Sequence, residues 1–103
     1  MEAPFNKLTP AQAERLALLS EELGEAQQAI GKILRHGYES RNPVAHGPTN
    51  RDALAKELGD VLCAIDIICL TGADLDFVDL NIARHEKRGR VGKYLHHIEL
   101  PIR

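Results

Sequence analysis

Apolar side chains in the first third of the chain recur at alternating spacings of three and four, the period of an amphipathic α-helix. The positions in register are Leu16, Leu19, Leu23, Ala26, Ile30 and Ile33. Thr9 can cap such a helix and Pro10 suits its first position, while Gly37 can end it after His36. The pattern predicts one long helix from Pro10 to about His36.

The same period returns further along the chain and predicts two more helices. The apolar positions of the second are Leu54, Leu58, Val61, Leu62, Ile65 and Ile68. Either Thr49 or Asn50 would cap this helix, and Thr71-Gly72 would end it. A third helix is expected from Asp74 to about Arg88. Gly89 and Gly92 would break it, and a short turn or helix would follow around residues 93–98.

The segments between and beyond these helices differ in kind. Residues 37–49 contain two glycines and two prolines and are long for a helix–helix connection, which indicates a functional loop or lid. Residues 1–8 are expected to form an N-terminal arm and residues 99–103 an extended C-terminal tail. A length of 103 residues favours a single domain over residues 1–103.

The amino-acid composition favours a helical fold over a β-sheet fold. Aromatic residues make up only 4% of the chain and there is no Trp, so the core must be aliphatic. Such a core favours an all-α antiparallel helical bundle over a β-sandwich. Three helices would leave Cys63, Ile67 and Leu70 off the main apolar stripe. We therefore expect the bundle to be completed by formation of a homodimer or homotetramer.

Charge and cysteine content indicate which partners and which cellular compartment to expect. A net charge of −2 does not favour nucleic acid as a partner. No apolar stretch approaches the 18 residues of a membrane span, and the N-terminus does not resemble a signal peptide. Cys63 and Cys69 lie six residues apart on one helix and cannot pair, so they are expected to be small buried hydrophobic residues. A cytoplasmic protein follows.

An internal repeat is the most informative feature of the sequence. Residues 22–30 read Glu-Leu-Gly-Glu-Ala-Gln-Gln-Ala-Ile, and residues 57–65 read Glu-Leu-Gly-Asp-Val-Leu-Cys-Ala-Ile. Each copy places two carboxylates three residues apart on one helix face. A single such pair is typical of a solvated surface, whereas two matched copies favour a shared site. Gly24 and Gly59 lie mid-helix at a cost of about 1 kcal/mol each, which favours close approach of a helix or a flat substrate.

Helical geometry predicts where the two carboxylate pairs lie. At about 100° per residue, Glu22 and Glu25 are offset roughly 75° and 135° from their apolar stripe, and Glu57 and Asp60 have the same offsets in the same sense. In an antiparallel helix pair, a local two-fold axis brings both acidic edges to the same side. Parallel helices would place these edges on opposite sides. An antiparallel hairpin would therefore assemble four carboxylates.

Four adjacent carboxylates repel one another unless a cation compensates them. No helix carries Glu-x-x-His, no cysteine belongs to the predicted cluster, and there is no EF-hand loop, which argues against di-iron, zinc and EF-hand calcium sites. Mg²⁺, or Mn²⁺ in its place, suits a few carboxylates together with water and substrate phosphates.

The paired motif resembles the E-x-x-E…E-x-x-D signature of the MazG-like all-α nucleoside triphosphate pyrophosphohydrolases. This group is related to dimeric dUTPases and dCTPases and to phosphoribosyl-ATP pyrophosphohydrolase. The resemblance covers roughly residues 9–95. It implies that the metal ligands are Glu22, Glu25, Glu57 and Asp60, and that Glu21 is a catalytic neighbour which orients a ligand or water. It also implies phosphate contacts in the later basic helix, at Asn81, Arg84, Lys87, Arg88 and Lys93.

By this resemblance the expected reaction is Mg²⁺-dependent hydrolysis of a (deoxy)nucleoside triphosphate to the monophosphate and pyrophosphate. The base is open, with dGTP or another purine deoxynucleotide as one candidate. Phosphoribosyl-ATP pyrophosphohydrolase is an alternative with the same chemistry. A non-catalytic helical interaction module and a metal-storage or metal-sensing protein are two further alternatives.

Asp66 and the five histidines are the remaining polar residues with a possible structural or functional role. Asp66 interrupts an apolar run, and we expect it to pair with a base across a helix contact. The histidines have no ligand spacing with the acids and are expected at the surface: His36, His46, His85, His96 and His97.

Overall fold

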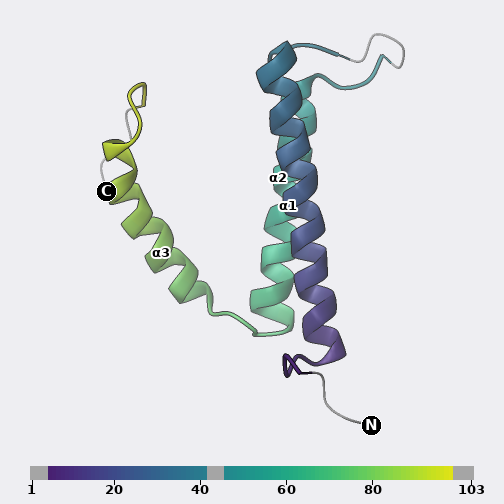
Figure 1. Ribbon diagram of the computed structural model, residues 1–103, viewed down its shortest axis with the longest axis vertical. Coiled ribbons are helices and arrows are strands. Elements are labelled where there is room, and N and C mark those ends of the chain that lie inside the picture. The colour runs from purple at the N-terminus through teal and green to yellow at the C-terminus, as the bar shows by residue number, and fades with distance from the viewer. Residues whose placement is uncertain (1–4, 42–45, 99–103) are drawn as a thin grey trace.

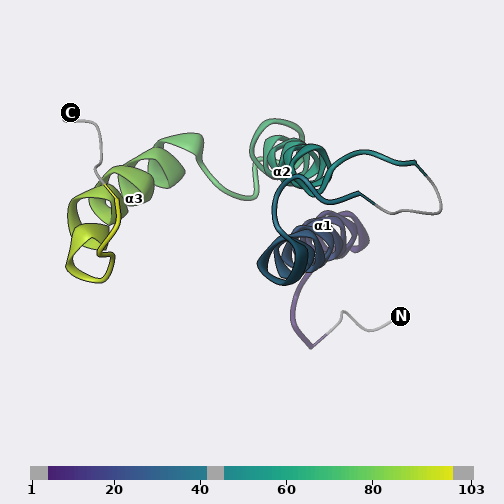
Figure 2. The same cartoon turned by 90° about the horizontal axis from the view of Figure 1, so that it is seen from above.

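The computed structural model describes residues 5–41 and 46–98 of the chain. Two long helices, α1 (Pro10–His36) and α2 (Asn50–Asp66), run antiparallel and side by side (Figures 1 and 2). α2 continues into the π-helical turn η1 (Ile67–Thr71). A third helix, α3 (Phe77–Arg90), then leads away from the hairpin and ends in the 3₁₀ turn η2 (Val91–Lys93). The predicted all-α fold is confirmed.

The bounds of α1 agree with the sequence pattern. The Thr9 hydroxyl accepts a hydrogen bond from the Gln12 N–H at 3.1 Å, and the Gln12 side chain accepts one from the Thr9 N–H at 2.9 Å. This reciprocal capping box satisfies two backbone donors that the helix leaves free. At the other end Gly37 has a φ of 87°, a conformation that glycine adopts without strain. The predicted helix from Pro10 to His36 is therefore confirmed.

α2 is capped by Thr49, whose hydroxyl accepts a hydrogen bond from the Asp52 N–H at 3.1 Å. The helical run ends at Gly72, as predicted, but its last five residues are π-helical rather than α-helical. The small size of Gly72 lets the Arg15 side chain pack against it. A Cβ at this position would overlap the guanidinium group of Arg15, which packs across the end of the hairpin.

α3 begins later than the sequence pattern predicts. Asp74 does not open the helix, because its carboxylate binds Arg15 through two hydrogen bonds of 2.6 and 3.0 Å. The cap is instead Asp76, which accepts from the Val78 N–H at 2.8 Å. Gly89 was expected to break the helix but lies within it. The short turn expected around residues 93–98 is the earlier turn η2.

The core of the hairpin is small and lies between α1 and α2. Its buried apolar residues are Ala26, Ala29, Val61, Ala64 and Ile68. Many large apolar side chains stay exposed, and α3 contains no buried residue. The radius of gyration is 17.6 Å, against about 13 Å for a compact domain of this length. The prediction that three helices leave apolar surface uncovered therefore holds for this chain.

Two predictions about the second helix are wrong. Cys63 is exposed rather than buried, because α3 does not cover its face of α2; Cys69 is half-buried, and burial raises the pKa of its thiol. Asp66 is exposed and takes part in none of the ion pairs among residues 5–41 and 46–98. The five histidines are all exposed, as predicted.

Backbone hydrogen bonds fasten both ends of the loop between α1 and α2. The Asn50 N–H donates to the Ser40 carbonyl at 2.9 Å, and the Arg51 N–H donates to the Tyr38 carbonyl at 2.8 Å. The Arg51 guanidinium also lies 4.3 Å from the centre of the Tyr38 ring. The loop is thus tied to the start of α2 at its base. Residues 42–45, like 1–4 and 99–103 of the predicted arm and tail, lie outside the described residues.

Candidate metal centre

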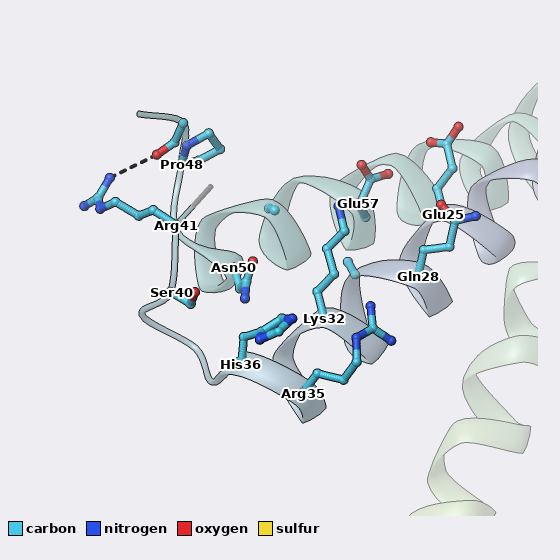
Figure 3. A pocket seen from close by; sticks show the side chains of 13 residues that line it. Glu25, Gln28, Lys32, Arg35, His36, Ser40, Arg41, Pro48, Asn50 and Glu57 are labelled. Atoms are coloured by element: carbon cyan, nitrogen blue, oxygen red, sulfur yellow. Dashed lines mark hydrogen bonds between the residues drawn. The ribbon is translucent and has the colours of Figure 1, made fainter. Parts of the chain in front are cut away.

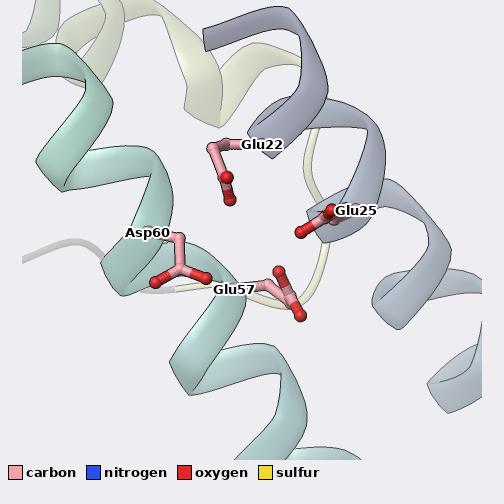
Figure 4. A group of neighbouring side chains, drawn as sticks. All are labelled: Glu22, Glu25, Glu57 and Asp60. Atoms are coloured by element: carbon pink, nitrogen blue, oxygen red, sulfur yellow. The ribbon is translucent and has the colours of Figure 1, made fainter. Parts of the chain in front are cut away.

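Four carboxylates meet on one side of the helical hairpin (Figure 4). Glu22 and Glu25 come from α1, and Glu57 and Asp60 come from α2. One oxygen from each side chain lies within 4.8 Å of the others, and all four residues are half-buried. The predicted convergence of the two carboxylate pairs across an antiparallel hairpin is confirmed. We refer to these residues as the acidic cluster.

The glycines of the repeat have no steric role within the described chain. Apart from the neighbouring residues and backbone of its own helix, no described residue lies within 4 Å of the position that a Cβ would occupy at Gly24 or Gly59. The expected close approach of a helix is therefore not found within one chain. The other expected use, contact with a flat substrate, stays a prediction.

The negative charge of the acidic cluster is only partly compensated by the described residues. The Oε2 atoms of Glu22 and Glu57 are buried and accept no hydrogen bond from any described residue. Burial raises the pKa of Glu22, and the nearby charge of Asp60 raises it further. The charge of Glu22 is the main cause of the raised pKa of Glu25. Repulsion and desolvation both disfavour the ionised cluster.

Lys56 is a cationic neighbour of the acidic cluster. Its Nζ lies 2.8 Å from Asp60 Oδ2 and 3.7 Å from Glu57 Oε1. The hydrogen bond to Asp60 raises the pKa of Lys56. The Lys56 side chain is 69% exposed, so water screens much of its charge. The buried oxygens of Glu22 and Glu57 stay unsatisfied.

The donor set fits a hard divalent cation. All four side chains offer oxygen, none is His or Cys, and two of the oxygens are buried without a partner among the described residues. Mg²⁺ and Mn²⁺ prefer such ligands, and Mg²⁺ usually keeps some of its water. A cation here would satisfy the orphaned oxygens and offset the repulsion between the carboxylates.

The raised pKa values predict how pH affects the metal-free protein. A carboxyl whose pKa is raised by folding binds its proton more tightly in the folded state, so stability falls as pH rises above the ordinary value of 4.5. Asp74 affects stability at a lower pH than the cluster does. The hydrogen bond with Arg15 lowers the pKa of Asp74, so the stability that this carboxylate contributes is lost only as the pH falls below the ordinary pKa of 3.8.

We therefore expect the melting temperature of chelator-treated protein to decline from pH 4.5 towards neutrality. The melting temperature of the variant Glu22→Gln should decline less steeply with pH, because this variant lacks one of the two carboxyls whose pKa is raised. Thermal unfolding followed by circular dichroism measures both slopes. Equal slopes for the wild type and the variant would contradict this account of the cluster.

The basic residues assigned to phosphate binding lie elsewhere in the molecule. Asn81, Arg84, Lys87 and Arg88 are on α3, and Lys93 is in η2. Because α3 leads away from the hairpin, a single chain does not bring them to the acidic cluster (Figures 1 and 2). Arg84 donates instead to Asn81 at 2.9 Å. Glu21 is exposed on α1, and its charge contributes to the raised pKa of Glu22.

A groove adjoins the acidic cluster and contains cations that the sequence reading missed. This α1–α2 groove has a volume of about 930 Å³ and runs from the cluster to the loop base (Figure 3). Its charged lining residues are Glu25, Lys32, Arg35, Arg41 and Glu57. One signal was available in the sequence: Lys32 follows Glu25 by seven residues, so both share one face of α1.

Comparison with known families agrees with this site. The family model of the MazG nucleotide pyrophosphohydrolase domain matches residues 11–87. The match covers most of the chain, and the protein belongs to this family. Membership of this family supports nucleotide pyrophosphohydrolase activity in general, and proteins of the family typically use divalent metals. No curated protein matches the chain significantly, and no solved structure does.

Within the described ranges, no helix combines the length and apolar character needed to span a bilayer.

Proposed function

We propose that the protein hydrolyses a (deoxy)nucleoside triphosphate to the monophosphate and pyrophosphate. Glu22, Glu25, Glu57 and Asp60 would bind Mg²⁺, which Mn²⁺ can replace. The observation that carries the proposal is the acidic cluster, with its two buried and unpartnered oxygens, in a chain of the MazG family. A purine deoxynucleotide such as dGTP is one candidate substrate.

The chain's own residues have distinct roles in this proposal. The four carboxylates hold the metal, and Glu21, exposed one position before Glu22, orients a ligand or the attacking water. The Lys56 Nζ, 2.8 Å from Asp60 Oδ2, would hold that carboxylate in position. When bound, divalent cations supply activation of water and neutralisation of charge on the leaving pyrophosphate.

The proposal includes a homodimer or homotetramer acting in the cytoplasm. α3 buries no residue and exposes Val78 and Ile82, so it has an apolar surface that a second copy could cover. In such an assembly α3 of one copy could bring its phosphate-binding candidates to the acidic cluster of another: Asn81, Arg84, Lys87, Arg88 and Lys93. The two free thiols favour a reducing compartment.

A substrate panel tests this function. The common NTPs, the dNTPs and phosphoribosyl-ATP are incubated with protein and Mg²⁺, and pyrophosphate and orthophosphate are measured separately. We expect pyrophosphate from at least one nucleoside triphosphate. Preference for phosphoribosyl-ATP would favour the biosynthetic alternative. Metal binding without turnover would indicate metal storage or sensing, and neither binding nor turnover would indicate an interaction module.

A further inference from the structure

We propose that the α1–α2 groove binds the outer phosphates of the substrate, and that Lys32 and Arg35 are the residues that recognise them. This inference rests on the proposed function of the adjoining acidic cluster. It assigns phosphate recognition to cations of the same chain, in addition to any that α3 of another copy supplies.

Helix geometry places these cations beside the acids. Glu25, Lys32 and Arg35 lie at intervals of seven and three residues along α1, so all three border the same groove. Lys32 and Arg35 are about 10 Å and 15 Å further along the helix axis than Glu25. Helical side chains lean towards the N-terminus, and the Lys and Arg side chains are longer than that of Glu25, so their cationic ends can reach further back along the helix. In Figure 3 the Lys32 side chain extends towards Glu57 on α2.

Arg35 is directed back along its own helix. Its Nη1 lies 3.5 Å from the position that a Cβ would take at Gly31. The guanidinium therefore packs over Gly31 and points towards Gln28 and the acidic end of the groove, as Figure 3 also shows. An arginine that served only to compensate the helix dipole would need no such direction, since it could extend into solvent beyond the last turn.

Both cations are free to bind a ligand. Neither Lys32 nor Arg35 takes part in any ion pair among residues 5–41 and 46–98. Arg41 lies at the far end of the groove, where its Nη1 donates to the Gly47 carbonyl at 3.2 Å. Once a metal neutralises Glu25 and Glu57, the groove is net positive on a protein whose overall charge is −2.

The lining of the groove leaves room for a phosphate chain. Ala29 and Ala53 line it from α1 and α2, respectively, and neither carries more than a methyl group. A polyphosphate whose inner phosphate lies at the acidic cluster can therefore extend along the groove past Lys32 and Arg35. This arrangement predicts that affinity rises with the number of phosphates beyond the one at the metal.

Calorimetric titration with inorganic tripolyphosphate and with orthophosphate, in the presence of Mg²⁺, tests the groove without a nucleoside. We expect the wild type to bind tripolyphosphate more tightly than orthophosphate. Each charge-assisted contact is worth roughly ten- to hundredfold in affinity. The double variant Lys32→Gln/Arg35→Gln should therefore lose at least roughly a hundredfold for tripolyphosphate and much less for orthophosphate.

A matched control removes one Lys and one Arg from outside the groove. Lys7→Gln/Arg90→Gln carries the same charge change at exposed positions and should bind tripolyphosphate within about twofold of the wild type. The Lys32→Gln/Arg35→Gln variant should still gain melting temperature with Mg²⁺ alone, because its acidic cluster is intact. On a hydrolysed nucleotide its KM should rise more than its kcat falls.

The possible outcomes distinguish a failure of the groove proposal from a failure of the proposed reaction. Unchanged tripolyphosphate affinity in the Lys32→Gln/Arg35→Gln variant, or no tripolyphosphate binding by the wild type, would overturn the groove even if pyrophosphate is released from a nucleotide. Tripolyphosphate binding that depends on Lys32 and Arg35, without hydrolysis of any nucleotide in the panel, would support the groove and overturn the proposed reaction.

Discussion

Replacing Glu57 by Gln is expected to reduce kcat by roughly a thousandfold or more while leaving the hairpin folded. The substitution keeps the shape of the side chain but removes a negative charge from the centre of the acidic cluster. A divalent metal supplies several kcal/mol of transition-state stabilisation, and each 1.4 kcal/mol corresponds to a factor of ten in rate. Loss of one ligand therefore affects turnover far more than folding.

The same variant should be more stable than the wild type when no metal is present. Glu57 contributes to the raised pKa of both Glu22 and Glu25, so its charge disfavours the metal-free cluster. Glu14→Gln, on the exposed surface of α1, is the matched control and should change neither property. Near-normal kcat in Glu57→Gln would remove this residue from the proposed ligand set.

Mg²⁺ is expected to raise the melting temperature of the wild type by roughly 10–20 °C at a hundred times its dissociation constant. A ligand that binds only the folded state at this concentration adds about 2.7 kcal/mol to the free energy of unfolding. A chain of about 100 residues gains roughly 4–8 °C for each kcal/mol. Differential scanning calorimetry of chelator-treated protein, with and without Mg²⁺, measures the shift.

We expect the rise in melting temperature with Mg²⁺ to depend on the acidic cluster and not on ionic strength. Adding NaCl to the same ionic strength should produce a small change, and the Glu57→Gln variant should lose most of the response to Mg²⁺. A melting temperature that is insensitive to millimolar Mg²⁺ and Mn²⁺ would argue strongly against a metal site. An equal response in the wild type and the variant would place the metal elsewhere.

Local signals in the sequence were sufficient to predict α1 and the position of the acidic cluster. Thr9 and Gly37 fix the ends of α1 through contacts within a few residues. The cluster could be predicted because its two halves repeat one pattern, so a single assumption, antiparallel packing, determined their relation. The structure agrees, with the four carboxylates gathered on one side of the hairpin.

Features that depend on distant contacts could not be predicted in this way. Asp74 looked like the start of α3, but Arg15, 59 residues earlier in the chain, binds it and moves the start to Phe77. The direction of α3 depends on the backbone between Gly72 and Asp76, for which no periodic signal exists. The groove cations were missed because Lys32 and Arg35 look like an ordinary solvated helix end until the loop base and α2 are placed beside them.

Hydrolysis in ¹⁸O-enriched water, followed by ³¹P nuclear magnetic resonance, tests the central claim most directly. The wild type, with Mg²⁺ and the nucleotide that it hydrolyses fastest, should yield monophosphate and pyrophosphate. The isotope shift should appear on the phosphorus of the monophosphate, because water attacks the α-phosphorus. Label in orthophosphate accompanied by a nucleoside diphosphate would contradict the proposed reaction, and label in pyrophosphate would place the attack on the β-phosphorus instead.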